Sequence, residues 1–304
     1  MTILVTGATG FVGQNLTKLN QNFRCVVRAG EHHAFTDSYT VPTIDASTDW
    51  SNCFDGVDSI IHLAGLAHNK LYTDAEYRAV NTEGTLRLAL KAAEAGVKRF
   101  VFISSIGVNG TSSYDRAFLP SDVAIPHNFY AQSKFEAELG LWDISEQTGL
   151  EIVIIRPTLV YGAAAPGNFG LLTKLVSKLP FLPFGLANNR RDFIAVKNLA
   201  DLLVTCATHP DAAGHTFLAS DGETVSIKQF TNALADGLGK KVIQLPVPVN
   251  VMRLLGKLTG KSAMIEQLYG NLEVDSSNIK EVLCWTPPLT MKQAMSTLCD
   301  SGVK

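Results

Sequence analysis

The chain has 304 residues, of which 46% are hydrophobic and 18% are charged, as expected of a globular protein with a substantial core. Lys and Arg number 26 against 28 Asp and Glu, so the chain lacks the basic surplus of nucleic-acid-binding proteins, and we expect no nucleic-acid partner. Its five cysteines form no C-x-x-C pair, which favours reduced thiols over a disulfide framework or a zinc site. At about 150 residues per domain, the length suggests two domains or one large one.

The first apolar run has no cationic segment before it and is interrupted by Thr6-Gly7, so no signal peptide is expected. The longest apolar stretches, such as Ile60–Ala67, fall far short of the roughly 18 residues that cross a bilayer. We therefore expect a cytoplasmic protein without a membrane partner. We interpret Leu254–Leu258 as part of a packed helix rather than as a membrane anchor.

In the first half, short apolar runs rich in β-branched residues alternate with helical patterns. One helical pattern extends from about Asp74 to Ala95 and ends at Gly96, and another extends from Tyr130 to about Gln147. Short strands separated by helices are typical of an α/β fold with a Rossmann-type, doubly wound parallel sheet. The runs that predict strands are Ile3–Val5, Phe23–Val27, Val41–Ile44, Ser59–Leu63, Phe100–Ser104 and Ile152–Ile155.

The second half changes character at Tyr161. Residues 161–189 are rich in Gly, Pro and Asn, which predicts loops and short helices around a cleft, and the chain from about Ser226 onwards is mainly helical. Phe193–Val196 and Thr216–Ala219 are candidates for strands that return to the main sheet. We predict a first domain over residues 1–159 and 193–221, and a smaller, mainly helical C-terminal substrate lobe over residues 160–192 and 222–304.

A glycine-rich loop, Thr6-Gly7-Ala8-Thr9-Gly10-Phe11-Val12-Gly13, follows the first predicted strand and opens a helix. In such a loop the first glycine permits a tight turn, the second lets the backbone approach a diphosphate, and the third allows close packing of helix and sheet. The strand–loop–helix setting predicts that the first domain binds a dinucleotide. The loop residues that we expect against the cofactor are Gly7, Thr9, Gly10, Phe11, Val12 and Gly13.

The position that normally reads the cofactor's ribose is unusual. An Asp or Glu at the end of the second strand usually accepts from the 2′-hydroxyl of NAD, but this chain has Arg28 there. Arg28 is consistent with NADP, through its 2′-phosphate, and equally with stacking on adenine or with exposure to solvent. We expect NAD and leave NADP open. Asp45, after the third strand, is placed to meet the adenine amino group.

Tyr130 and Lys134 lie four residues apart on a predicted helix, which places a phenol and an ammonium on one face, about 6 Å apart along the axis. A tyrosine with an ordinary pKa of about 10 is a poor base at neutral pH, and a nearby cation lowers that pKa towards the working range. Ser104 and Ser105 end the fifth predicted strand, where an open parallel sheet builds its site. A hydroxyl there can polarise a substrate oxygen beside the tyrosine.

These motifs together resemble the extended short-chain dehydrogenases/reductases of the NAD-dependent epimerase/dehydratase family, most of all its UDP-glucose 4-epimerase-like members. The resemblance covers nearly the whole chain. The segments that carry it are the glycine loop, His62-Leu63-Ala64-Gly65, Asn81 within Val80–Thr85, Ser104-Ser105, Tyr130-x-x-x-Lys134, Arg156–Gly162 and Arg191–Val196.

The resemblance implies a role for each matching residue. Tyr130 would be the acid/base on a sugar hydroxyl, Lys134 would bind the nicotinamide ribose, and Ser105, five residues before Gly110, would be the active hydroxyl. Asn109 departs from the pattern, since a tyrosine often stands at that position. Further cofactor-binding residues would be Leu63, Ala64, Gly65, Asn81, Ser104 and Pro157. Substrate-binding residues besides Ser105 would be Asn168 and Arg191 at the diphosphate and Phe184 near the nucleobase, and Phe184 fits a plain packing loop equally well.

Three functions follow from this pattern. The first is a nucleotide-sugar 4-epimerase, acting on a UDP-hexose or UDP-N-acetylhexosamine by transient oxidation at C4 with bound NAD(P). The second is an NAD(P)H-dependent reductase of a nucleotide-linked 4-keto-6-deoxy sugar, which Arg28 favours because a dissociable NADPH suits reduction. The third, a non-catalytic NAD(P)-sensing protein, requires a broken Ser/Tyr/Lys set, and this set is intact. The resemblance also implies a homodimer through the helices at Asp74–Ala95 and Tyr130–Gln147.

Overall fold

The computed structural model describes residues 1–67 and 72–300. Across these residues, seven parallel strands form the main sheet in the order β10-β6-β5-β4-β1-β2-β3, which confirms the predicted doubly wound fold. The strands of this sheet are β1 (Thr2–Thr6), β2 (Asn22–Arg28), β3 (Ser38–Val41), β4 (Ser59–His62), β5 (Arg99–Ile103), β6 (Glu151–Pro157) and β10 (Thr216–Ala219).

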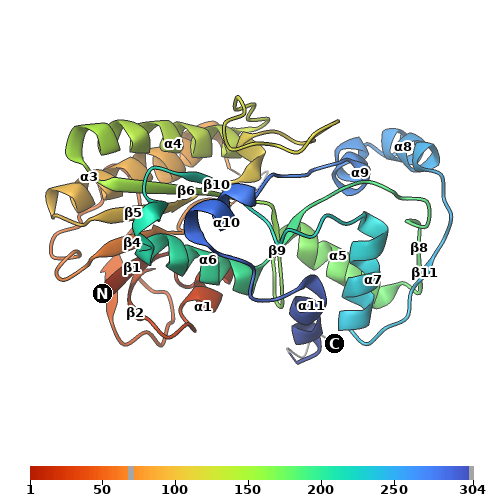
Figure 1. Ribbon diagram of the computed structural model, residues 1–304, viewed down its shortest axis with the longest axis horizontal. Helices are drawn as coiled ribbons and strands as arrows, with labels where there is room; N and C mark the ends of the chain where they lie inside the picture. Colours follow the sequence, from red (N-terminus) through yellow and green to blue (C-terminus); the bar gives the residue numbers. More distant parts are fainter. Residues whose placement is uncertain (68–71, 301–304) are drawn as a thin grey trace.

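Helices cover both faces of the main sheet (Figure 1). Helices α3 and α4 cover one face and enclose a hydrophobic core against the sheet. Helices α1, α6 and α10 cover the other face and enclose a second core. Because both faces are covered, β1, β4, β5 and β6 are buried along most of their length, and their central residues are apolar. The helical segments here are α1 (Phe11–Leu16), α2 (Asp74–Tyr77), the π-helix η1 (Arg78–Gly84), α3 (Thr85–Glu94), the 3-10 segments η2 (Ile106–Val108) and η3 (Pro210–Ala212), α4 (Phe129–Thr148), α6 (Val196–Thr208) and α10 (Ser277–Leu283).

A smaller, mainly helical lobe follows β6 (Figure 1). Its core gathers aromatic side chains, among which Phe193 stacks on Phe230 with ring centroids 3.7 Å apart. The lobe contains β7 (Leu159–Tyr161), α5 (Gly167–Lys178), β8 (Phe181–Leu182), β9 (Phe193–Ala195), α7 (Ile227–Gly237), β11 (Ile243–Gln244), α8 (Val249–Leu258), α9 (Ser262–Tyr269) and α11 (Met291–Asp300).

The structure corrects two predicted strands. Residues 193–195 do not return to the main sheet, since β9 pairs with β7, and the stacking of Phe193 holds this strand in the core of the lobe. The third strand, predicted at Val41–Ile44, is β3 at Ser38–Val41. It is an edge strand with one buried residue, Val41, so its apolar pattern is weak. The remaining predicted strands of the first half and Thr216–Ala219 are confirmed within two residues.

Candidate active site

The candidate site lies where the carboxyl ends of β1, β4 and β5 meet. The neighbours of β1 are β2 on one side and β4 on the other, so the direction of the chain connections reverses at this point. Open parallel sheets bind ligands in the crevice outside such a reversal. The predicted cofactor residues gather along this edge: the glycine loop follows β1, Leu63–Gly65 follow β4, and Pro157 ends β6.

The glycine loop has the shape that a dinucleotide diphosphate requires. Gly7 adopts a φ of +69°, and a Cβ on it would lie 2.8 Å from Ala64 N. A Cβ on Gly13 would lie 2.3 Å from Gly7 O, so only glycine permits the close approach of α1 to the loop. Helix α1 begins at Phe11 without a side-chain cap or an acidic first turn, which leaves its amino end open to a phosphate. These residues fit the diphosphate of a dinucleotide.

Arg28 does not stand alone at the end of β2. Its Nε and Nη2 both donate to Glu31 Oε1, at 2.9 Å and 2.6 Å. Glu31 Oε2 accepts from the Thr9 hydroxyl of the glycine loop at 3.1 Å. The hydrogen bonds from Arg28 and Thr9 lower the pKa of Glu31, against the opposing effect of its burial. A carboxylate therefore borders the glycine loop three residues beyond the position where the sequence analysis found a cation.

Asp45 lies in the loop after β3, and its side chain caps that loop. Asp45 Oδ1 accepts from the backbone N–H and the hydroxyl of Ser47, at 2.8 Å and 2.6 Å. These bonds lower the pKa of Asp45, so it is an anion at neutral pH. Its contact with adenine stays a prediction.

A buried hydrogen-bond chain joins β1, β4 and α3 beneath the crevice. The Thr6 hydroxyl lies 2.7 Å from His62 Nδ1, and His62 Nε2 lies 2.9 Å from the Thr85 hydroxyl. Thr85 donates onward to Asn81 O at 2.7 Å, so His62 Nε2 is the protonated nitrogen and Nδ1 accepts from Thr6. Burial, with the nearby charge of Lys134, lowers the pKa of His62 to about 3. The imidazole is therefore neutral and connects the strands.

Asn81 links the loop after β4 to helix α4. It is buried in the π-helical segment η1, a geometry that is frequent at functional sites. Its Oδ1 accepts from Leu66 N at 2.7 Å, and its Nδ2 donates to the Ser133 hydroxyl at 3.1 Å. A Cβ on Gly65 would lie 2.8 Å from Asn81 Oδ1 and 3.4 Å from Lys134 Nζ. Asn81 thus aligns α4 with the edge of the sheet.

Helix α4 presents the predicted catalytic pair. Asn128 caps the helix by accepting from Ala131 N at 2.8 Å, which places Tyr130 in its first turn. Tyr130 forms a hydrogen bond with the Ser105 side chain, and this bond opposes the effect of burial, which raises the pKa of Tyr130 to about 12. Lys134 Nζ donates to Ile103 O at 2.9 Å and lies 4.6 Å from the centre of the Phe102 ring. Ser105, Tyr130 and Lys134 therefore lie together near the end of β5, and their catalytic roles stay predictions.

The electrostatics of Lys134 depend on the next turn of α4. Burial lowers the pKa of Lys134 to about 8, while the charge of Glu138 opposes that shift. Lys134 therefore stays cationic at neutral pH. That its ammonium stabilises a phenolate at Tyr130, one helical turn away, stays a prediction.

Glu138 belongs to a buried network that sequence reasoning missed. Its carboxylate accepts from the Ser104 hydroxyl and from both Nε and Nη2 of Arg156, with Nε at 2.9 Å. Arg156 Nη1 donates to Asn109 Oδ1 at 3.0 Å, and Asn109 donates to Leu119 O at 3.2 Å. Asn109, where similar proteins often have a tyrosine, thus holds the arginine. Since the Ser104 side chain points into this network, a contact with cofactor would involve its backbone.

The predicted substrate residues lie in or beside the lobe. Asn168 is exposed near the start of α5 and donates to Gln267 Oε1 at 3.4 Å. Arg191 is buried and donates to Gly270 O at 3.0 Å; burial lowers its pKa to about 10, against the charge of Asp192, so it remains a cation. Phe184 is buried beside Tyr269 in the core of the lobe. The structure brings none of them into hydrogen-bond contact with Tyr130 among the described residues, and their substrate contacts stay predictions.

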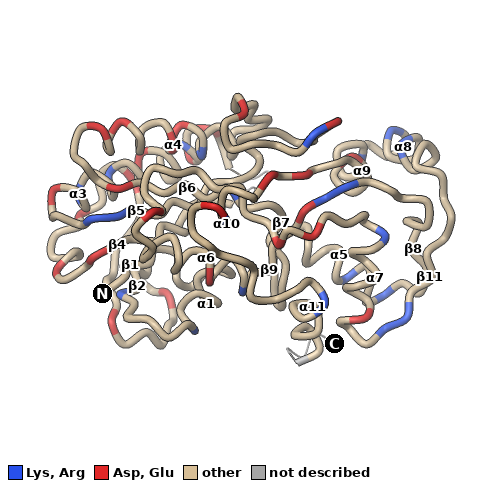
Figure 2. The backbone as a smooth tube through the Cα atoms, in the orientation of Figure 1, with Lys and Arg blue, Asp and Glu red and all other residues tan. Residues whose placement is uncertain are grey.

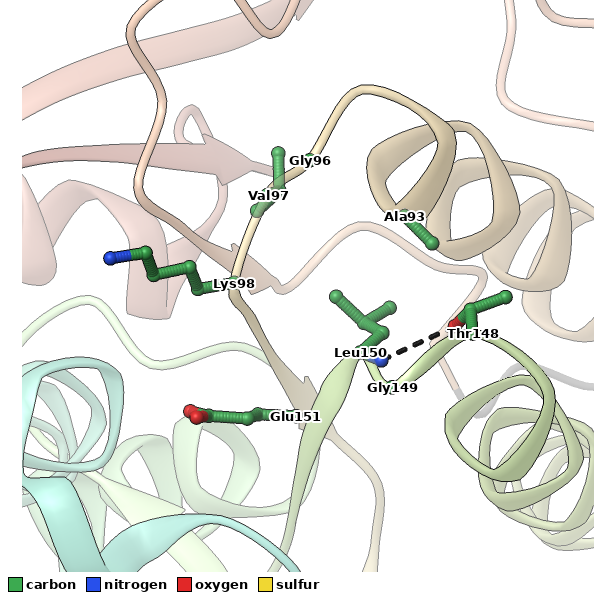
Figure 3. A pocket seen from close by; sticks show the side chains of 8 residues that line it. All are labelled: Ala93, Gly96, Val97, Lys98, Thr148, Gly149, Leu150 and Glu151. Carbon is green, nitrogen blue, oxygen red and sulfur yellow. Dashed lines mark hydrogen bonds between the residues drawn. The ribbon is translucent and has the colours of Figure 1, made fainter.

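The opposite edge of the sheet carries a different feature. A hollow of about 280 Å³ lies between the ends of α3 and α4 and the starts of β5 and β6 (Figure 3). Its charged side chains are Lys98 and Glu151, and neither belongs to the network described above.

The residues of the site that the sequence analysis gave no role differ in whether a sequence pattern could have indicated them. Glu31 stands three residues after Arg28, a spacing at which opposite charges commonly pair, so it could have been found. Glu138 gave no such signal, because its partners are distant in sequence. His62 stands in a motif that the sequence analysis named, but its partners Thr6 and Thr85 are also distant.

The fold and the site define a dinucleotide-binding enzyme of the extended short-chain dehydrogenase/reductase class. A model of the NAD dependent epimerase/dehydratase family matches residues 3–220, and the chain belongs to this family. A UDP-glucose 4-epimerase of Vibrio cholerae is 43% identical over 302 residues, covering 96% of this chain and 92% of that protein.

Two solved structures share the fold over nearly the whole chain. UDP-glucose 4-epimerase of Thermotoga maritima, determined with UDP-glucose, superposes with a TM-score of 0.78 at 19% identity, over 99% of this chain and 98% of that one. UDP-glucuronic acid 4-epimerase from Bacillus cereus, in complex with NAD, superposes with a TM-score of 0.75 at 20% identity, over 99% and 98%.

Proposed function

We propose that the protein is a UDP-sugar 4-epimerase that retains NAD through its catalytic cycle. The observation that carries this proposal is the meeting of Ser105, Tyr130 and Lys134 at the crevice edge. The 43% identity to a UDP-glucose 4-epimerase supports the choice of reaction.

The residues of the chain move the proton of the reaction. When bound, NAD would supply the chemistry that takes a hydride from C4 of the sugar and returns it to the opposite face. Tyr130 takes the proton of the 4-hydroxyl as the carbonyl forms, and gives it back as the inverted hydroxyl forms. Lys134 stabilises the phenolate form of Tyr130, and Ser105 donates to the sugar oxygen. The pKa of about 12 that burial gives Tyr130 means that neighbouring positive charge must lower it before it acts as a base at neutral pH.

Glu31 supports NAD rather than NADP. Its carboxylate lies against Thr9 of the glycine loop and can accept from a ribose hydroxyl, whereas it would repel a 2′-phosphate. Arg28, the residue that raised the question of NADP, is held by Glu31. We expect Glu31→Gln to weaken NAD binding to cofactor-free protein and to narrow its preference over NADP by at least tenfold, measured by titration calorimetry. An unchanged ratio of the two affinities would remove Glu31 from this role.

The lobe would hold the nucleotide part of the substrate. We propose that the main-sheet domain binds NAD and that the lobe binds the UDP-sugar. The predicted boundaries, residues 1–159 and 193–221 against 160–192 and 222–304, change at β9, which belongs to the lobe, and at α10, which packs on the main sheet. Arg191 is a nearly buried cation, suited to a diphosphate through charge-assisted hydrogen bonds, and Asn168 lies at the start of α5. Phe184 would contribute by shaping the wall of the nucleobase site from the core.

Exposed apolar side chains on α3 and α4 support the proposal that the protein forms a homodimer. One side of each helix packs on the sheet. The other side carries exposed apolar side chains, namely Leu90 on α3 and Phe129 and Leu139 on α4. Covering them with the same layer of a second copy would bury this apolar surface.

The reaction is tested by supplying UDP-glucose or UDP-N-acetylglucosamine to the purified protein without added cofactor. We expect the 4-epimer to accumulate, with no net change in the absorbance of reduced nicotinamide. Inert UDP-sugars, together with stoichiometric consumption of NAD(P)H by a nucleotide-linked 4-keto sugar, would replace this proposal with the reductase.

A further inference from the structure

Helix α8 carries an apolar face that is open to solvent. Val251, Leu254, Leu255 and Leu258 are between 44% and 75% exposed. Their spacing of three, four and seven residues from the first places them along one side of the helix. Scattered exposed apolar residues are normal on protein surfaces, but a contiguous apolar face marks an interaction site. The sequence-based interpretation of Leu254–Leu258 as packed is therefore wrong for this face.

The opposite side of α8 is fixed to the lobe by α9. Gly256 is buried, and a Cβ on it would lie 2.8 Å from Ile265 Cγ1. Lys261 N–H donates to Gly256 O at 2.7 Å, which closes the turn between the helices. Figure 1 places this pair of helices at the end of the lobe that is distant from the main sheet. Packing on the inner side thus fixes the apolar face in an outward orientation.

The segment that contains α8 is strongly basic within a chain of net charge −2. From Gly237 to Ile265 it has no Asp or Glu, and its cations are Lys240, Lys241, Arg253, Lys257 and Lys261. Arg253 is paired with Glu266 of α9 at 2.9 Å. Lys257 lies within α8, beside the apolar face, and Lys261 follows the helix; Figure 2 shows the cations on α8.

We propose that α8 docks this protein on an anionic lipid bilayer. The side chains of its apolar face enter the boundary between headgroups and acyl chains, and Lys257 and Lys261 lie at the level of the anionic headgroups. Attachment would be peripheral, since no helix in the described part of the chain is long and apolar enough to cross a membrane. This inference departs from the sequence-based expectation of no membrane partner, and it does not depend on the proposed reaction.

Charge favours a bilayer over a second copy of the chain as the occupant of this face. Arg253 is already paired with Glu266, so pairing two α8 faces would bring Lys257 and Lys261 of both copies together, and like charges in contact oppose association. An anionic lipid surface complements both the apolar face and its cations.

The test is flotation of the full-length protein with vesicles of phosphatidylcholine, with or without phosphatidylglycerol. We expect binding to the phosphatidylglycerol vesicles that weakens as salt is raised. The double variant Leu254→Ser/Leu258→Ser should lose at least tenfold in vesicle affinity. Lys257→Gln/Lys261→Gln should lose about fivefold per cation, and only towards the anionic vesicles.

Two control variants match these changes elsewhere on the surface. Val123→Ser replaces an exposed apolar side chain of the first half, and Lys280→Gln/Lys292→Gln removes two exposed cations; both should float like the unmodified protein. The proposal is overturned if the unmodified protein binds neither vesicle, or if the double leucine variant floats equally well. It is also overturned if that variant instead lowers the oligomer mass in light scattering, which would assign the face to a second copy.

Discussion

Helices α4 and α8 place their polar and apolar residues in opposite ways. Helix α4 buries Ser133, Lys134 and Glu138, and each has a hydrogen-bond partner on another element. Helix α8 leaves the apolar face that contains Leu254 and Leu258 in water. A buried charge is tolerated only when its partners are in place, so the buried side of α4 serves a fixed internal geometry. An apolar face exposed to water is suited to contact with a partner. Mutations can therefore test the roles of the two helices separately.

Tyr130→Phe should have the largest effect on turnover. Removing the hydroxyl deletes the path of the proton and very little contact area, so we expect kcat to fall by roughly 10²–10⁴-fold while UDP binding by calorimetry is retained. Tyr114→Phe, which removes the hydroxyl of an exposed tyrosine, is the matched control. A Tyr130→Phe variant with most of its activity would refute the assignment of the acid/base.

Glu138→Gln tests whether the interior of α4 depends on its buried pair. The change leaves Arg156 as a buried cation without its carboxylate, and we expect the free energy of unfolding to fall by about 3 kcal/mol, measured by chemical denaturation. Glu136 is also on α4, and its partially exposed carboxylate pairs with Arg78. Glu136→Gln should lower the free energy of unfolding by less than about 1 kcal/mol. Equal losses in the two variants would contradict the importance that we assign to the network.

His62 gives the fold a dependence on acid pH. Its folded pKa of about 3 lies below the ordinary value of 6.5, so below pH 6.5 the unfolded chain binds a proton that the folded protein does not. Stability therefore falls as the pH is lowered through this range, by about 2 kcal/mol from this group between pH 7 and pH 5. His62→Gln should show a correspondingly smaller loss in urea denaturation at the two pH values. A loss as steep as in the unmodified protein would show that other groups cause it.

The two helices should also differ in their response to apolar truncation. Leu258→Ser on α8 changes an exposed residue, and we expect the free energy of unfolding to change by less than about 0.5 kcal/mol. Leu141→Ala on α4 opens a cavity in the core and should cost roughly 2–5 kcal/mol; Leu141 is buried. Thermal and chemical unfolding of both variants make this comparison. A large loss for Leu258→Ser would mean that its face packs within the protein.

The sequence was sufficient where the signal is local. The glycine loop, the spacing of Tyr130 and Lys134, and the apolar strands of a sheet covered on both faces are short-range patterns, and the structure places them as predicted. It was insufficient where partners are distant: Glu138 meets Arg156, and His62 meets Thr6, only after folding.

The same reasoning explains the errors in the second half. An apolar helical pattern predicts a buried face, but the pattern cannot tell whether another element of the chain will cover it. In α8, Gly256 and α9 hold the other side, so the leucine-rich face remains outside. The run at Phe193–Ala195 had the composition of a main-sheet strand, but its pairing with β7 was decided by packing in the lobe.

The central claim is that Tyr130 and its neighbours support inversion at C4 with return of the same hydrogen. The direct test is turnover of a UDP-hexose deuterated at C4, without added cofactor, followed by NMR of the product. The proposed epimerase predicts that the inverted sugar retains deuterium at C4. Inverted product that has exchanged its C4 label for solvent hydrogen would contradict the account.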